Sequence, residues 1–148
     1  MTMIKSDSYH NPPDEWSFES IKTRYFEAID KANAQASINF DAIEQYPELI
    51  KIKKTLQLIS YALKSNDAGA IEVSVTFVTS PVYFHYSGYI RETMARRLKH
   101  CSMTIEQQKA IISGVESIIK NKQFSYEFKE ISKLYNRVKE LCKCKRAV

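Results

Sequence analysis

Glycine is scarce in this chain of 148 residues, which contains only Gly69, Gly88 and Gly114. Loops that cradle phosphates, turns that bind dinucleotides and the strained turns that carry nucleophiles need several glycines close together. The three glycines lie far apart in the sequence, so none of these devices can be assembled. This excludes the enzyme classes that depend on them.

Cysteine is also sparse, and long hydrophobic runs are missing. Cys101, Cys142 and Cys144 cannot all pair with one another, so we expect reduced thiols and a cytoplasmic protein. The N-terminal sequence has no apolar core or cleavage site of a signal peptide, and no apolar run approaches the ~20 residues that span a membrane. Cys142 and Cys144 have no second ligand pair nearby, so we expect neither a metal nor another cofactor.

Charge is divided unevenly along the chain. The net charge is +5, but residues 1–48 carry nine acidic and four basic side chains, and residues 49–148 carry eight acidic and eighteen basic ones. Such asymmetry is typical of a protein with an electrostatically complementary partner. The alternative is that these charges only keep helix surfaces hydrated.

Apolar side chains recur at steps of three and four residues along most of the chain, which predicts amphipathic helices. The expected segments are 16–34, 49–64, 89–100, 104–118 and 126–142, and Thr104 with Gln107 forms a capping box. Residues 1–15 are expected to be a flexible tail and 143–148 a basic tail. The sequence thus predicts one all-α domain at 16–142, built as a stack of about six antiparallel amphipathic helices.

The segment 70–79 is ambiguous because its apolar residues alternate as in a strand. The alternating residues are Ile71, Val73, Val75 and Phe77. No second segment alternates as cleanly, and a lone strand would leave its backbone groups without partners. We therefore predict a helix that is buried on most sides and capped by Asp67.

The segment 80–99 is the densest in aromatic residues, and it also carries arginines. Tyr83, Tyr86, Tyr89, Arg91 and Arg96 are the expected partner-binding anchors, because tyrosine and arginine dominate the centres of protein interfaces. The same combination can stack on bases and bind phosphates. A structural role competes with both readings, and Phe84 with one of the tyrosines is expected in the core.

Acidic residues of the first predicted helix are the expected complementary charges. Glu19, Glu27 and Asp30 would set the orientation of a partner, although they could equally be an ordinary hydrated face. No histidine is placed beside a serine or cysteine by the sequence pattern, and His100 and Cys101 diverge on a helix. We therefore expect a protein that is not an enzyme and has no small-molecule substrate.

The run Ser80-Pro-x-Tyr-Phe-x-x-Ser-Gly-Tyr-Ile-Arg-x-x-x-x-Arg-Arg-Leu-Lys99, followed by Thr104-Ile-Glu-Gln-Gln, resembles small bacterial all-helical proteins of HEAT-like build. Such folds act as binding surfaces made of stacked helix pairs. In size and composition the chain is similar to bacterial immunity proteins of contact-dependent inhibition systems. These resemblances imply a protein that binds and occludes a toxin domain. The alternative is a nucleic-acid-binding protein that uses the basic C-terminal two-thirds.

Overall fold

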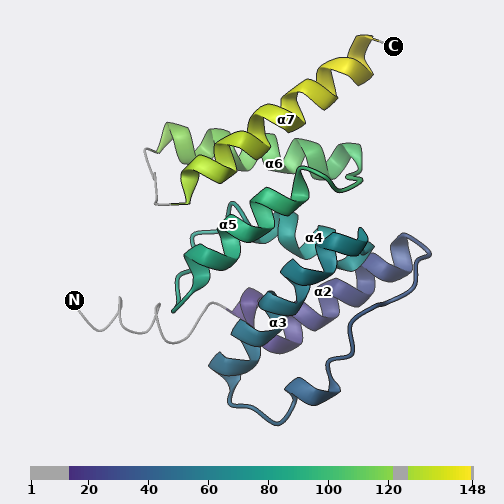
Figure 1. Ribbon diagram of the computed structural model, residues 1–148, viewed down its shortest axis with the longest axis vertical. Helices are drawn as coiled ribbons and strands as arrows, with labels where there is room; N and C mark the ends of the chain where they lie inside the picture. Colours follow the sequence, from purple (N-terminus) through teal and green to yellow (C-terminus); the bar gives the residue numbers. More distant parts are fainter. Residues whose placement is uncertain (1–13, 122–126, 148) are drawn as a thin grey trace.

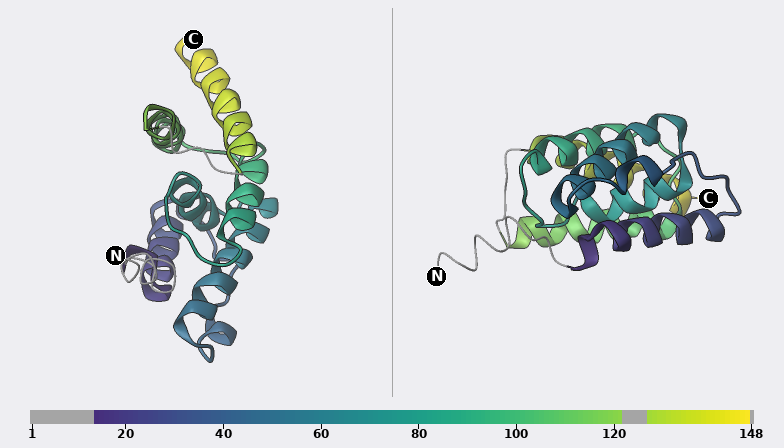
Figure 2. Two further views of the ribbon diagram at one scale, coloured as in Figure 1. Left: turned by 90° about the vertical axis from the view of Figure 1, so that its left-hand side faces the viewer. Right: turned by 90° about the horizontal axis from the view of Figure 1, so that it is seen from below.

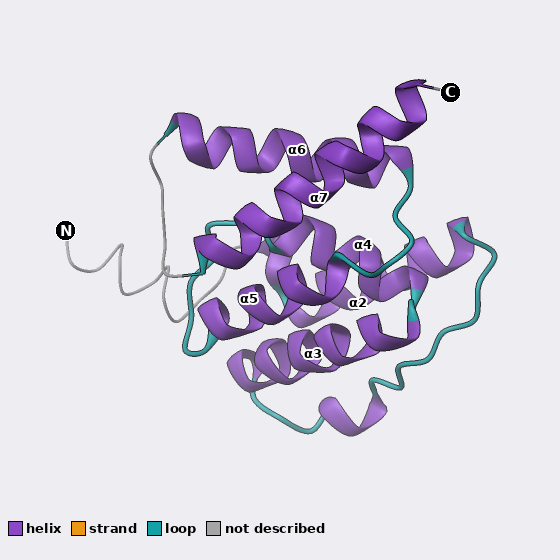
Figure 3. Ribbon diagram, turned by 45° about the horizontal axis from the view of Figure 1, so that its top comes forward, coloured by secondary structure: helices purple, strands orange, loops and turns teal. Residues whose placement is uncertain are grey.

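The computed structural model describes residues 14–121 and 127–147, and all regular structure in these ranges is helical (Figures 1 and 3). The α-helices are α2 (Phe18–Lys31), α3 (Glu48–Ala62), α4 (Ala68–Phe77), α5 (Ser87–Leu98), α6 (Ile105–Lys120) and α7 (Phe128–Ala147). Three short 3-10 turns accompany them, η1 (Asp14–Trp16), η2 (Asp41–Ile43) and η3 (Leu63–Ser65). The predicted all-α fold is confirmed.

Side-chain caps fix where three of the helices begin. Ser17 accepts a hydrogen bond from the backbone N–H of Ser20 at the start of α2. Asp67 caps α4, and Thr104 and Gln107 form both halves of the predicted capping box on α6. Each cap satisfies backbone N–H groups that the first turn of a helix leaves without partners.

The helices form two layers, one of α2, α4 and α6 and the other of α3, α5 and α7 (Figure 2). Helices α3 and α5 run in the same direction, because Lys53 lies over the ring of Tyr86 and Arg97 donates to the carbonyl of Ser60. Consecutive helices from α3 to α7 alternate in direction. Helix α2 instead runs parallel to α3. Residues 32–47 lead the chain back to the side of the molecule where α2 begins, and α3 starts there.

Helix α4 lies at the centre of the molecule, as the prediction for 70–79 required. It packs on α2, α3, α5 and α6, and seven of its ten residues are buried. The ring of Trp16 meets that of Phe77 edge-on at 5.1 Å between centroids. Because neighbours surround α4, apolar residues occupy most of its circumference, and their alternation in sequence does not indicate a strand.

Of the two tails that the sequence predicts, the C-terminal one is helical in the structure. The expected N-terminal tail lies outside the described residues up to residue 13, and η1 begins at Asp14. At the other end α7 continues to Ala147, past the predicted end of the last helix at Cys142. Lysine and arginine are good helix formers, and cations at a helix C-terminus interact favourably with the helix dipole. The basic residues therefore extend the helix instead of ending it.

Candidate binding surface

The loop before α5 and the first turn of α5 place three tyrosines on the surface. Tyr83, Tyr86 and Tyr89 expose 62%, 53% and 64% of their surface, whereas Phe84 of the same segment is buried. Phe84 is in the core as predicted, but none of these three tyrosines is. We call the three side chains the tyrosine surface.

The backbone at Tyr86 helps to hold this surface in place. Tyr86 adopts the left-handed conformation (φ 73°, ψ 4°), which is uncommon for residues with a side chain. The next residue, Ser87, accepts a hydrogen bond from the backbone N–H of Phe84 at 3.0 Å. The ring of Tyr86 then lies beside that of His85, with 4.2 Å between centroids, and under the ammonium of Lys53, at 4.1 Å.

Arg91 is not part of the exposed surface, which corrects its assignment as a binding anchor. Its side chain is only 7% exposed, and Nη1 donates to Glu127 Oε1 at 2.9 Å. Nη2 and Nε donate to the carbonyls of Val82 and Phe77 at 2.5 and 3.4 Å. Burial lowers the pKa of Arg91, and the charge and hydrogen bond of Glu127 oppose that shift. Arg91 is a positioning residue that ties the loop carrying the tyrosines to α4 and to the start of α7.

The other predicted site residues are exposed, and of them only Arg96 is on the same helix as one of the three tyrosines, two turns beyond Tyr89 on α5. Arg96 forms an ion pair with Glu92 at 3.4 Å on the surface of α5. Glu19, Glu27 and Asp30 are exposed along α2, which belongs to the other layer and packs mainly on α3 and α4. The structure therefore separates the predicted acidic charges from the tyrosine surface.

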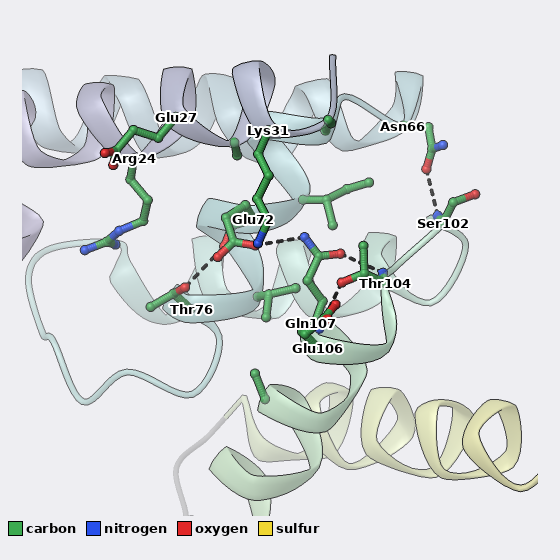
Figure 4. Close-up of a pocket in the computed structure, with 16 residues that line it drawn as sticks. Arg24, Glu27, Lys31, Asn66, Glu72, Thr76, Ser102, Thr104, Glu106 and Gln107 are labelled. Atoms are coloured by element: carbon green, nitrogen blue, oxygen red, sulfur yellow. Dashed lines mark hydrogen bonds between the residues drawn. The ribbon is translucent and has the colours of Figure 1, made fainter. Parts of the chain in front are cut away.

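A groove that no sequence pattern indicated lies across the layer of α2, α4 and α6 (Figure 4). Its volume is about 570 Å³, within the range of ligand-binding pockets. Helix α4 forms its floor with Ile71 and Val75, and Glu27 of α2 is part of its wall. Gln107 of α6 donates to Glu72 Oε1 at 2.9 Å and joins two of the helices at this groove.

The groove was missed because three distant segments build it. Small residues leave the space open: Ala28 on α2, Ala68 on α4 and Ala110 on α6 all line it. An alanine is equally common in a tightly packed core, so the sequence alone does not show that these alanines line a groove.

The described residues include no cluster of three or more histidine, cysteine or acidic side chains that could hold a metal ion. Cys142 Sγ lies 3.4 Å from Gln108 Oε1, and the side chain of Cys144 lies outside the described residues. Burial raises the pKa of the Cys101 thiol, which disfavours the reactive thiolate.

No helix among the described residues is long and apolar enough to cross a membrane. Comparisons of the chain with models of protein families, with curated proteins and with solved structures found no match.

Proposed function

We propose that the protein is a non-enzymatic module that binds another protein through the tyrosine surface. The observation that carries this proposal is the exposure of Tyr83, Tyr86 and Tyr89, at 53–64%, within seven consecutive residues. Tyrosines are among the residues that contribute most to binding at protein interfaces, because they bury a large area at little cost in conformational entropy.

A fixed position makes exposed tyrosines better anchors, since less freedom is lost on binding. The buried contacts of Arg91 hold the loop at Val82, and Ser87 holds the backbone of Phe84. These contacts restrict the backbone that carries the tyrosine surface, which reduces the freedom lost when a partner binds.

The partner that we propose is a toxin domain, which the protein neutralises by covering its active surface. This role rests on the resemblance to immunity proteins in size and composition. The alternation of helices from α3 to α7 in two layers supports a HEAT-like stack, a kind of fold that presents broad binding surfaces.

The test is the residual activity of a candidate toxin domain, titrated with the full chain. We expect inhibition that is complete near equimolar protein, and its loss in the variant Tyr83→Ala/Tyr86→Ala/Tyr89→Ala. Tyr61→Ala is the matched control, because Tyr61 is also 64% exposed but lies on α3. A toxin that keeps full activity at saturating protein contradicts the proposal for that toxin. Equal inhibition by the triple variant removes the tyrosine surface from it.

A second candidate, nucleic-acid binding, is favoured by the position of Lys53 over the ring of Tyr86. A cation next to an exposed ring can bind a phosphate while the ring stacks on a base. This function predicts affinity that falls steeply with salt, and charge reversal at Lys133 or Arg137 on α7 should weaken binding to every sequence. Anisotropy of labelled DNA and RNA at low salt measures it, and the absence of binding there excludes it.

A further inference from the structure

The groove across α2, α4 and α6 follows the length of α4 (Figure 4). Its lining residues on α2 and on α4 recur at steps of three and four, which places each group on one side of its helix. They are Arg24, Glu27, Ala28, Lys31 and Ala32 from α2 and its C-cap, and Ala68, Ile71, Glu72, Val75 and Thr76 from α4. Eight helical steps span about 12 Å, so the groove runs along α4 for roughly two turns.

The floor of the groove is apolar and buried, whereas its walls are open to solvent. Ile71 and Val75 are each 3% exposed, while Glu27, Lys31 and Ala110 on the walls are exposed. A pocket for a small ligand encloses most of the ligand's surface, which requires buried walls. An open groove with an apolar floor is instead typical of a site for an amphipathic helix, which lays side chains at steps of three and four on the floor.

Glutamates from all three helices border this floor. Glu27 comes from α2, Glu72 from α4 and Glu106 from α6. Among the described residues, none of the three has a lysine, arginine or histidine nitrogen within ion-pair distance. Carboxylates without an ion-pair partner beside an apolar floor attract basic side chains that flank an apolar stripe.

The two basic residues of the groove both come from α2. Arg24 donates from Nη2 to the carbonyl of Glu15 at 3.1 Å, and its guanidinium lies 4.5 Å from the ring centroid of Trp16. These contacts hold Arg24 at one end of the groove, while Lys31 points from α2 towards Glu72 (Figure 4). Beside the floor, the three carboxylates therefore outnumber the ammonium of Lys31.

The two layers of helices also differ in charge. Helices α3, α5 and α7 carry thirteen basic and four acidic residues, whereas α2, α4 and α6 carry five basic and six acidic ones. Like charges repel a partner and opposite charges attract it, so a basic segment is directed away from the first layer and towards the second. The groove lies in that second layer.

We propose that the groove binds a basic amphipathic helix of a partner protein, with apolar side chains on Ile71 and Val75 and with lysines or arginines beside Glu27, Glu72 and Glu106. About two to three turns of such a helix match the length of the floor. The contact is small, so the complex forms and dissociates readily. The site does not depend on the tyrosine surface, which lies on α5 and the loop before it.

The test is the fluorescence anisotropy of a labelled synthetic peptide titrated with the full chain. The probe is a helical peptide with leucines at steps of three and four and with lysines on both sides of them. A scrambled peptide has the same composition and charge but no apolar face. We expect the probe to bind at least about tenfold more tightly than the scrambled peptide, because only the probe covers the apolar floor. No binding of the probe, or equal binding of the two peptides, overturns the proposal.

Charge reversal tests whether the probe lies in the groove. Glu27→Lys/Glu106→Lys should weaken binding of the probe at least about tenfold. Glu19→Lys/Glu116→Lys is the matched control, because it makes the same change of net charge at exposed positions of α2 and α6 that do not line the groove. Both variants should keep the circular dichroism and thermal midpoint of the native chain. Equal weakening by the two variants overturns the site.

A second probe, in which glutamates replace the lysines, tests the same contacts with the charges exchanged. It should bind Glu27→Lys/Glu106→Lys at least about fivefold more tightly than Glu19→Lys/Glu116→Lys, although the two variants have the same net charge. Equal affinities overturn the proposed charge pairing. The variant Tyr83→Ala/Tyr86→Ala/Tyr89→Ala should bind the lysine probe as the native chain does. Loss of binding in that variant would place the peptide on the tyrosine surface and overturn the groove as its site.

Discussion

The hydroxyl of Tyr25 on α2 donates a hydrogen bond to Asp67 Oδ2, at 2.8 Å, and accepts one from the backbone N–H of Ser37, at 3.0 Å. The other carboxylate oxygen of Asp67 accepts from the backbone N–H of Ala70 at 2.9 Å and so caps α4. The hydroxyl of Ser37 also donates to Asp67. These bonds join α2 and the segment that follows it to the start of α4, where Asp67 lies 42 residues after Tyr25 and 30 after Ser37.

Tyr25→Phe should lower the free energy of unfolding by about 1–3 kcal/mol, because it removes the hydroxyl and leaves buried polar groups without a partner. Chemical denaturation followed by circular dichroism measures the change. Tyr61→Phe is the matched control, since Tyr61 is 64% exposed, and it should shift stability by no more than about 0.5 kcal/mol. Equal effects of the two substitutions would contradict the role of the Tyr25 hydroxyl.

Alkaline pH should destabilise the protein through the same residue. Burial raises the pKa of Tyr25 above its ordinary value of about 10, and the hydrogen bond to Asp67 raises it further. The unfolded chain therefore releases this proton at a lower pH than the folded protein does. The stabilisation is complete below about pH 10, and it is lost as the pH rises towards the folded pKa. Denaturant midpoints between pH 8 and 11 should fall more steeply for the native chain than for Tyr25→Phe, and parallel curves would contradict this.

Arg91→Ala should lower the free energy of unfolding by about 3–5 kcal/mol, because it leaves Glu127 charged and buried without its partner. Arg91→Lys should recover little, since the three N–H groups of an ammonium share one nitrogen and cannot reach the three separate acceptors that Nε, Nη1 and Nη2 of Arg91 contact. Arg96→Ala, which removes only a surface ion pair, should change stability by less than about 1 kcal/mol. Thermal unfolding of the three variants distinguishes a buried structural role for Arg91 from an exposed, partner-binding one. A loss below about 1 kcal/mol in Arg91→Ala would contradict the buried role.

Gly114→Ala should destabilise the contact between α6 and Thr79 in the turn that follows α4. A Cβ at this position would lie 2.6 Å from Thr79 Oγ1 and 2.7 Å from Thr79 Cβ, both closer than van der Waals contact allows. Overpacking of this kind typically costs about 1–3 kcal/mol. The double variant Thr79→Gly/Gly114→Ala removes the clash, so its loss should be smaller than the sum of the two single losses. Additive losses in a double-mutant cycle would contradict this contact.

Several features of the fold could be predicted because they depend on residues close together in the sequence. The cap at Asp67 and the capping box of Thr104 and Gln107 are local hydrogen bonds within one turn, and both are present as expected. The helical stripes are likewise local, because a repeat of 3.6 residues places them on one side of a helix. The scarcity of glycine excluded whole classes of phosphate-binding loop without any knowledge of packing.

The candidate site could not be predicted in the same way, because it depends on which helices pack together and these are distant in the sequence. Arg91 borders an apolar stripe in the sequence. Its side chain is buried only because Val82, Phe77 and Glu127 approach it and accept its hydrogen bonds. The groove similarly needs α2 and α6 on the two sides of α4. The sequence by itself therefore determined the helices, and most of their boundaries to within about two residues, because capping and amphipathicity act over a few residues. Only the tertiary structure decided which aromatic and charged side chains remain exposed, because burial depends on neighbours that come from distant parts of the chain.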